Sequence, residues 1–172
     1  MQNHGIVVYL ECAGGQPVKA GLEALNAAKR LAAQQGGKPV AVVLLDSADA
    51  AAEAGAYGAD EILSVQVGGY QPESCAAALA ELCRRYEADC LLLGSTRDGK
   101  ELAARVAARL GAGCVTDATG LSEQGWVRSV YGGSLLETVA VEAPAVVTIR
   151  SGSFGKPERE EGRTAPVSQE TV

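Results

Sequence analysis

Short apolar runs along the chain alternate with stretches in which apolar residues recur every three or four positions. The runs lie at 5–11, 39–45, 61–67 and 89–95, and the helical spacing covers 18–35 and 49–56, begins again near Pro72 and returns after Gly94. Strand and helix in this order predict a parallel sheet with helices on both faces and right-handed crossovers. Sheets of this kind bind ligands beyond the carboxyl ends of their strands, where the strand order reverses.

The pattern changes after Gly113. Four β-like runs follow without a helical period between them, at 113–122, 125–133, 135–142 and 145–150. Because Gly, Ser and Pro separate these runs, we expect hairpins or a meander there. The predicted fold class is therefore α/β, with a mainly parallel sheet between two helical layers and β-hairpin strands at its end.

The last residues have a different composition. Residues 156–172 are charged, contain Pro and hold few apolar side chains, which predicts a linker or tail. We therefore place one folded domain at 1–155, a size that a single hydrophobic core can serve.

The stretch GSTRDGK, 94–100, has the spacing of a nucleotide-binding P-loop up to its last position. A P-loop needs a Ser or Thr hydroxyl after its Lys to ligate magnesium, but Glu101 follows here, and Asp98 adds a second negative charge. Asp98 and Glu101 instead have the spacing of a helix capping box. This pattern favours a strand, a glycine turn and a capped helix over a phosphate loop.

Charge and composition exclude several classes of function. The 172 residues carry a net charge of -6 and a pI near 4.9, so nucleic acid is not an expected partner. No apolar run is long enough to span a membrane. The only histidine, His4, precedes the first predicted strand, so a histidine base or zinc site is not expected.

Cysteine usage indicates a reducing compartment. The five cysteines are an odd number without a C-x-x-C pair, and no charged and apolar leader opens the chain. We expect a cytoplasmic protein in which each cysteine fills space in the core, and no metal site.

Several blocks of the sequence resemble the N-terminal domain of the α subunit of electron transfer flavoproteins. They are EALNAAKRLA (23–32), YGADEIL (57–63), LLLGSTRDGKELAARVAARLGAGCVTDATGL (91–121), VRSVYGG (127–133) and PAVVTIRSGSFG (144–155). The resemblance covers nearly the whole chain from Gly5 to Gly155. One departure is Ala104, where the family block would have Pro.

The resemblance implies an adenine-nucleotide α-hydrolase-like, Rossmann-like fold and a non-enzymatic role. The domain would form a heterodimer with an electron transfer flavoprotein β subunit and support FAD-mediated electron transfer from acyl-CoA or other dehydrogenases to an acceptor. In this family FAD lies mainly in a separate C-terminal domain, and the β subunit binds AMP or a second flavin. That C-terminal domain is absent here, so the chain is either a piece of a longer α subunit or a stand-alone relative.

Two groups of residues are candidate sites. Gly94, Ser95, Thr96 and Gly99 lie at the carboxyl end of a predicted strand, where a nucleotide or flavin phosphate would sit, although a turn that needs glycine explains them too. Asp46 could bind a ribose hydroxyl or cap a loop.

The second group is a predicted interface. The resemblance places Asp117, Arg128, Tyr131, Gly132 and Gly133 in the part of the α subunit that meets the β subunit, whereas a simple hairpin with Tyr131 packed on the sheet is the alternative. For Trp126 we expect a buried or interface position.

Two other functions stay open at this point. One is a stand-alone protein that binds AMP or ATP over Gly94 to Gly99. The other is a nucleotide hydrolase, which would lack a convincing magnesium ligand, histidine base or nucleophile in this sequence.

Overall fold

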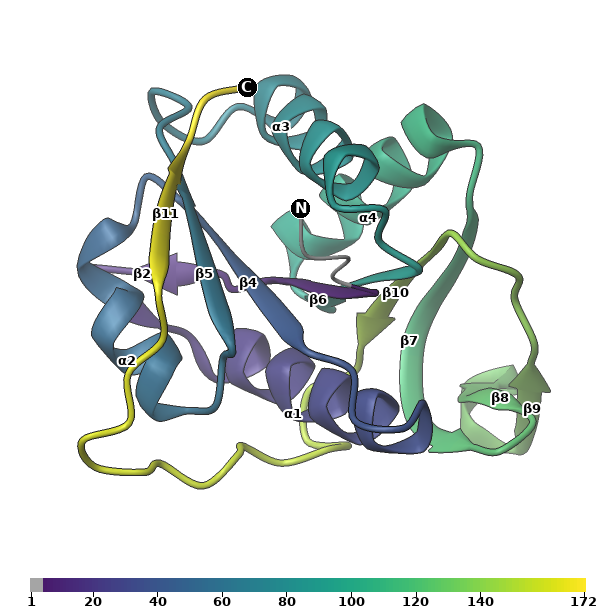
Figure 1. Cartoon of the computed structure of the whole chain (residues 1–172). Coiled ribbons are helices and arrows are strands. Elements are labelled where there is room, and N and C mark those ends of the chain that lie inside the picture. The colour runs from purple at the N-terminus through teal and green to yellow at the C-terminus, as the bar shows by residue number, and fades with distance from the viewer. Residues whose placement is uncertain (1–4) are drawn as a thin grey trace.

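Nine strands form one sheet with helices on both of its faces, as the computed structural model of residues 5–172 shows (Figure 1). The sheet strands are β1 (Ile6–Tyr9), β4 (Val40–Leu45), β5 (Glu61–Val65), β6 (Cys90–Gly94), β7 (Gly113–Ser122), β8 (Gly125–Val130), β9 (Leu135–Val139), β10 (Ala145–Ile149) and β11 (Val167–Glu170). The helices are α1 (Lys19–Gln34), α2 (Ala51–Ala56), α3 (Pro72–Arg85) and α4 (Arg97–Leu110), with single 3-10 turns η1 (Ala48–Ala50) and η2 (Tyr131–Gly133). A separate small hairpin joins β2 (Cys12–Ala13) and β3 (Gln16–Pro17).

Alternating side chains of β1 reach the two faces of the sheet. Ile6 and Val8 belong to the core under α1, whereas Val7 and Tyr9 belong to the core under α3 and α4. All four residues are buried, as expected for a strand with parallel neighbours and a helical layer on each side. The predicted three-layer α/β fold is confirmed.

The order of the strands is β11-β5-β4-β1-β6-β10-β7-β8-β9. From β1 the chain moves outward through β4 and β5, and then returns across α3 to β6 on the other side of β1, with parallel pairing throughout. The order therefore reverses between β1 and β6. In an open α/β sheet the crevice outside the carboxyl ends of two such strands is the usual ligand site.

The late strands only partly match the predicted meander. Strands β7, β8 and β9 pair antiparallel in sequence, but β10 lies between β6 and β7 and is parallel to both. The expectation that 145–150 would belong to the meander was therefore wrong. Strand β10 is buried along its whole length, and its continuous apolar run is typical of a central parallel strand.

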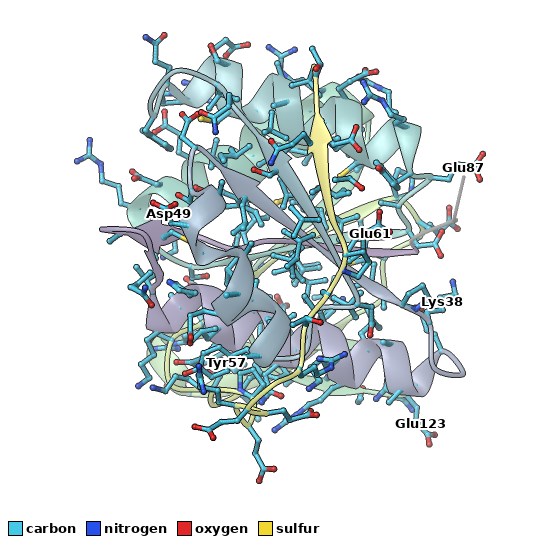
Figure 2. The ribbon with its side chains drawn as sticks, turned by 60° about the vertical axis from the view of Figure 1, so that its left-hand side comes forward. Lys38, Asp49, Tyr57, Glu61, Glu87 and Glu123 are labelled. Atoms are coloured by element: carbon cyan, nitrogen blue, oxygen red, sulfur yellow. The ribbon has the colours of Figure 1, made fainter. Side chains whose placement is uncertain are left out.

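The final segment also differs from the predicted linker or tail. Strand β11 pairs in parallel with β5, from Val167 opposite Ile62 to Glu170 opposite Val65, and Figure 2 shows it crossing the molecule beside Glu61. The preceding stretch is held by ion pairs of Arg159 with Glu53 and of Arg163 with Asp60. The segment has few apolar residues because it supplies an edge strand, which alternates between exposed and half-buried positions.

Candidate functional site

Helix α4 begins at the sheet edge where the strand order reverses. Its N-cap is Thr96, whose hydroxyl oxygen accepts a hydrogen bond from the Gly99 N–H at 2.9 Å. The same hydroxyl donates to Glu11 Oε2 at 2.6 Å, which joins the ends of β1 and β6. The predicted capping box of Asp98 and Glu101 was wrong, because Thr96 serves as the cap two residues earlier.

Close packing explains the two glycines of the predicted cofactor loop. A Cβ atom on Gly94 would lie 2.9 Å from backbone atoms of Ala20 in α1, and one on Gly99 would overlap the Gly94 carbonyl oxygen. Neither glycine has a positive φ angle, so the need is for space and not for a left-handed backbone. The structure thus gives both residues a packing role, while phosphate binding by this loop stays a prediction.

Ser95 joins a small polar cluster that also contains Asp117. Ser95 Oγ and Thr148 Oγ1 share a hydrogen bond of 2.7 Å, and the Thr148 oxygen also accepts from the Asp117 N–H at 2.9 Å. Lys100 Nζ lies 3.2 Å from Asp117 Oδ2. The cluster forms because β10 carries Thr148 between the ends of β6 and β7.

The carboxyl group of Asp117 stays ionised to low pH. Partial burial works to raise its pKa, but hydrogen bonds from Ser95 and Lys100, with the charges of Lys100 and Arg150, lower the pKa below its ordinary value. A residue predicted for the interface is therefore adjacent to Ser95, which was predicted for the cofactor site.

The other predicted interface residues gather at the hairpin of β8 and β9, the end of the sheet opposite β11 (Figure 1). Arg128 on β8 faces Glu137 on β9, with Arg128 Nε 3.2 Å from Glu137 Oε1. Tyr131, Gly132 and Gly133 form η2, which connects the two strands, and all three have positive φ angles. The Tyr131 side chain is 80% exposed and does not pack on the sheet.

Two further apolar residues lie next to this turn and were not singled out from the sequence. Leu135 is 56% exposed and Leu136 is 71% exposed at the start of β9. As successive residues of a strand they expose apolar side chains on its two faces, and exposed large apolar side chains mark candidate interaction sites. The sequence did contain a signal, because two consecutive leucines in a strand point to opposite faces. Where only one face of a strand packs on the core, one of the two leucines must be exposed.

Trp126 occupies a different environment at the base of the same hairpin. It is 4% exposed and meets Phe154 edge to face, with the ring centroids 6.4 Å apart. The Arg30 guanidinium lies over the Phe154 ring, 5.2 Å from its centroid. The expectation of a buried or interface tryptophan is confirmed as burial.

Two acidic residues hold loops at the carboxyl edge of the sheet. Asp46 has a φ angle of 50° and accepts hydrogen bonds from the N–H groups of Val67, Gly68 and Gly69, which lower its pKa, the bond from Gly69 most strongly. Asp46 therefore caps a loop. Glu23 of α1, which sequence reasoning missed, is fully buried, and both of its carboxylate oxygens accept from the Gly152 N–H.

The cysteines are all free thiols, and they occupy unequal positions. Cys75, Cys83 and Cys90 are buried, and burial raises the pKa of Cys83 to about 12, so it is an unreactive core residue. Cys114 is exposed, so the expectation that every cysteine fills the core was wrong. Cys114 lies at the start of β7, where the first two residues of the strand are exposed.

The structure describes residues 5–172, and His4 lies outside this range. Within it, histidine, cysteine, aspartate and glutamate side chains form no group of three that could hold a metal ion. Across the same residues, each helix is too short or too polar to cross a membrane.

Comparison with known proteins adds a family assignment to this geometry. The model of the electron transfer flavoprotein domain matches residues 6–172. Among similar proteins, an electron transfer flavoprotein subunit alpha of Thermoanaerobacterium thermosaccharolyticum is 30% identical over 94% of this chain and 52% of its own. The Protein FixB of Azorhizobium caulinodans is 33% identical over 90% of this chain and 46% of its own. An electron transfer flavoprotein subunit alpha of Mycobacterium tuberculosis is 33% identical over 86% of this chain and 48% of its own. The chain thus spans about half the length of these relatives.

Proposed function

The chain belongs to the electron transfer flavoprotein family, and from this we propose that it acts as the N-terminal domain of an α subunit, docking with a β subunit. In this role it supports FAD-mediated transfer of electrons from acyl-CoA or other dehydrogenases to an acceptor. It is a carrier module without a catalytic group of its own. The family match over residues 6–172 and the relatives named subunit alpha support the assignment.

The observation that carries the docking proposal is the exposed apolar surface of the β8–β9 hairpin. We call Tyr131, Leu135 and Leu136 the docking patch. Leu135 and Leu136 lie opposite Val130 and Ser129 in the β8–β9 register, directly beside the turn that holds Tyr131. Consecutive strand residues point to opposite faces, so Leu135 shares a face with the charged pair Arg128 and Glu137, whereas Leu136 lies on the other face. Exposed Tyr and Leu side chains with charged residues beside them are typical of a protein interface.

Strand β9 gives the docking patch a second means of recognition. Among residues 5–172 it is the last strand of the sheet, so within this range the backbone N–H and C=O groups of its outer edge have no neighbouring strand. Four of its five residues are exposed. A partner that pairs with the strand edge can therefore also cover the apolar side chains on either side of that edge.

The residues at the reversal of the strand order do not fit FAD. The cavity there has a volume of about 170 Å³, and the carboxylates of Glu11, Asp46 and Asp98 line it. Sites for cofactor-sized ligands are larger, and these charges would repel a pyrophosphate. We therefore propose that FAD is held elsewhere in the complex and that AMP, where bound, belongs to the β subunit, so no electron-transfer step is assigned to these residues.

The test is the affinity of the purified chain for an electron transfer flavoprotein β subunit of the same organism. Leu136→Asp should weaken the complex at least about tenfold, because it places a charge in the apolar centre of the interface. Val167→Asp is the matched control, since Val167 is also an exposed strand residue, 49% exposed at the opposite edge of the sheet. Equal weakening by both substitutions, or by neither, would contradict docking through this hairpin.

A further inference from the structure

The small cavity at the reversal of the strand order is a built site of its own, separate from the docking patch. We call it the acidic socket and define it by Tyr9, Glu11, Asp46, Tyr70 and Asp98. Tyr9 ends β1 and Glu11 follows it, Asp46 follows β4, Tyr70 follows β5, and Asp98 lies in the first turn of α4. Four separate parts of the chain therefore meet around a volume of about 170 Å³.

Tyr9 is the first sign that the socket takes a ligand. Its side chain is 7% exposed, yet no residue among 5–172 forms a hydrogen bond with its hydroxyl. Although it lacks a partner, the hydroxyl oxygen is not fully covered by other atoms, so it opens onto the cavity that Tyr9 lines. Buried tyrosine hydroxyls usually have a partner, and burial raises the pKa of Tyr9, so this hydroxyl is a neutral group ready to bond.

The charge of the socket is the second sign. Glu11, Asp46 and Asp98 form no ion pair with any lysine or arginine in the described part of the chain. Acidic residues elsewhere do, as Glu73 pairs with Arg105 and Asp117 with Lys100. The N–H groups of Gly69, Val67 and Gly68 keep the pKa of Asp46 low, so its charge persists at neutral pH. The socket therefore attracts cations and repels phosphates.

The aromatic side chain of Tyr70 indicates which kind of cation the socket can bind. Tyr70 is 44% exposed at the mouth of the socket, and burial together with the charges of Asp98 and Glu101 raises its pKa to about 12, so its ring stays neutral. A neutral tyrosine ring beside carboxylates suits an organic cation, which can gain from the ring face as well as from the charges. The absence of a three-ligand group among residues 5–172 argues against a metal ion here.

We propose that the acidic socket binds one alkylammonium or guanidinium group, with the carboxylates of Glu11 and Asp98 and the Tyr9 hydroxyl as its partners. The volume holds a head group of this size and is too small for a nucleotide. The group can belong to a free amine or to a lysine or arginine side chain of another protein. This inference does not rest on docking through β9, because it uses other residues.

The experiment titrates the full chain at low salt with agmatine, which carries a guanidinium and an ammonium group, and follows backbone amide shifts by NMR. We expect saturable binding with the largest shifts at residues of the socket. Tyr9→Phe should weaken binding about tenfold, since it removes one hydrogen bond to a charged group. Asp98→Asn should weaken it by a similar factor, which provides a second variant if Tyr9→Phe unfolds.

The controls are a hydroxyl and a carboxylate outside the socket. Tyr57→Phe and Glu123→Gln should leave the affinity for agmatine unchanged within about twofold, because neither residue lines the socket. Figure 2 shows Glu123 far across the molecule from Asp49, which follows Asp46 closely in the chain. A fall in affinity for these controls as large as for Tyr9→Phe would overturn the proposal.

Two further titrations complete the test. AMP should not shift the socket residues, and AMP binding without agmatine binding would overturn the proposal in favour of a nucleotide site. A peptide with one arginine and blocked ends distinguishes the sources of the cation. Tighter binding of the peptide than of agmatine would indicate a partner side chain, and agmatine binding alone would indicate a free amine, with the same loss in Tyr9→Phe expected in both cases.

Discussion

Strands β6 and β9 belong to one sheet but bury their leucines to opposite degrees. Leu92 of β6 is fully buried, whereas Leu136 of β9 is 71% exposed. Strand β6 has a parallel neighbour on each side and helices on both faces, while β9 ends an antiparallel hairpin beyond the helical layers. The same residue type therefore stabilises the fold at one place and remains available to a partner at the other.

The buried strands of the sheet serve folding, whereas the exposed end of the hairpin is accessible to other molecules. The parallel strands β1, β4, β6 and β10 are buried along their whole length and supply the two cores. The hairpin contributes Trp126 to one of these cores and leaves its far end in solvent. Substitutions in the parallel strands should therefore lower the free energy of unfolding, whereas substitutions at the end of the hairpin should weaken binding to a partner.

The largest expected effect comes from Gly99→Ala in the tight turn of the parallel region. The new methyl group would overlap the Gly94 carbonyl oxygen, so α4 would have to shift away from β6. We expect the free energy of unfolding to fall by about 3 kcal/mol or more, measured by urea denaturation. Gly120→Ala on β7 is the control, because its Cβ would lie at an ordinary 3.5 Å from Val127, and an equal loss there would refute the packing role of Gly99.

Replacing the two leucines tests the comparison directly. Leu92→Ala should lower the free energy of unfolding by about 2–5 kcal/mol, because it leaves a cavity in the core between the sheet and α1. Leu136→Ala should change it by less than about 0.5 kcal/mol, and it should instead weaken binding to the β subunit. Urea denaturation and binding titrations on both variants check this pair, and a stability loss for Leu136→Ala similar to that for Leu92→Ala would show that the hairpin belongs to the core.

Thr96→Val should have a smaller effect at the junction of β6 and α4. It keeps the shape of the side chain but removes the hydroxyl that caps the helix and bonds Glu11. We expect a loss of about 1 kcal/mol in the free energy of unfolding, the usual value for a lost N-cap. Thr119→Val on β7 is the matched control, since the Thr119 hydroxyl makes one bond, of 3.3 Å, to Val127, and the interpretation fails if the two substitutions cost the same.

The sequence was informative where structure depends on residues close together in the chain. Apolar runs and helical spacing predicted the parallel strands from β1 to β6 and the helices between them, since each pattern reports the local environment of its own segment. The β7–β8 and β8–β9 hairpins were also predictable, because glycine turns join adjacent strands.

Pairing between distant segments was not predictable in this way. Nothing local indicated that β10 would enter between β6 and β7, or that β11 would return to β5. The cluster of Ser95, Asp117 and Thr148 depends on that placement of β10, so its members were first assigned to different sites. The socket likewise needs Tyr9 and Asp98 to meet, which only the strand order brings about.

The smallest effect expected is a pH dependence at Asp117, where the hairpin region joins the parallel region. Its pKa is lowered in the folded protein, so the unfolded state takes up the proton first as the pH falls. The stabilisation is complete above the unfolded pKa of about 3.9 and is lost as the pH falls through the folded pKa. Because 40% of the side chain is exposed, solvent screening keeps it under about 0.5 kcal/mol.

Asp117→Asn isolates this charge, since Asn also tolerates the φ angle of 56° at this position. The urea midpoint of the parent protein should exceed that of the variant near neutral pH and approach it at about pH 2. Lys100→Gln should reduce the same difference, and the two substitutions together should cost less than the sum of their separate effects, because they remove one shared interaction. A difference between parent and Asp117→Asn that persists unchanged at low pH would mean that Asp117 acts there through its shape and not through its charge.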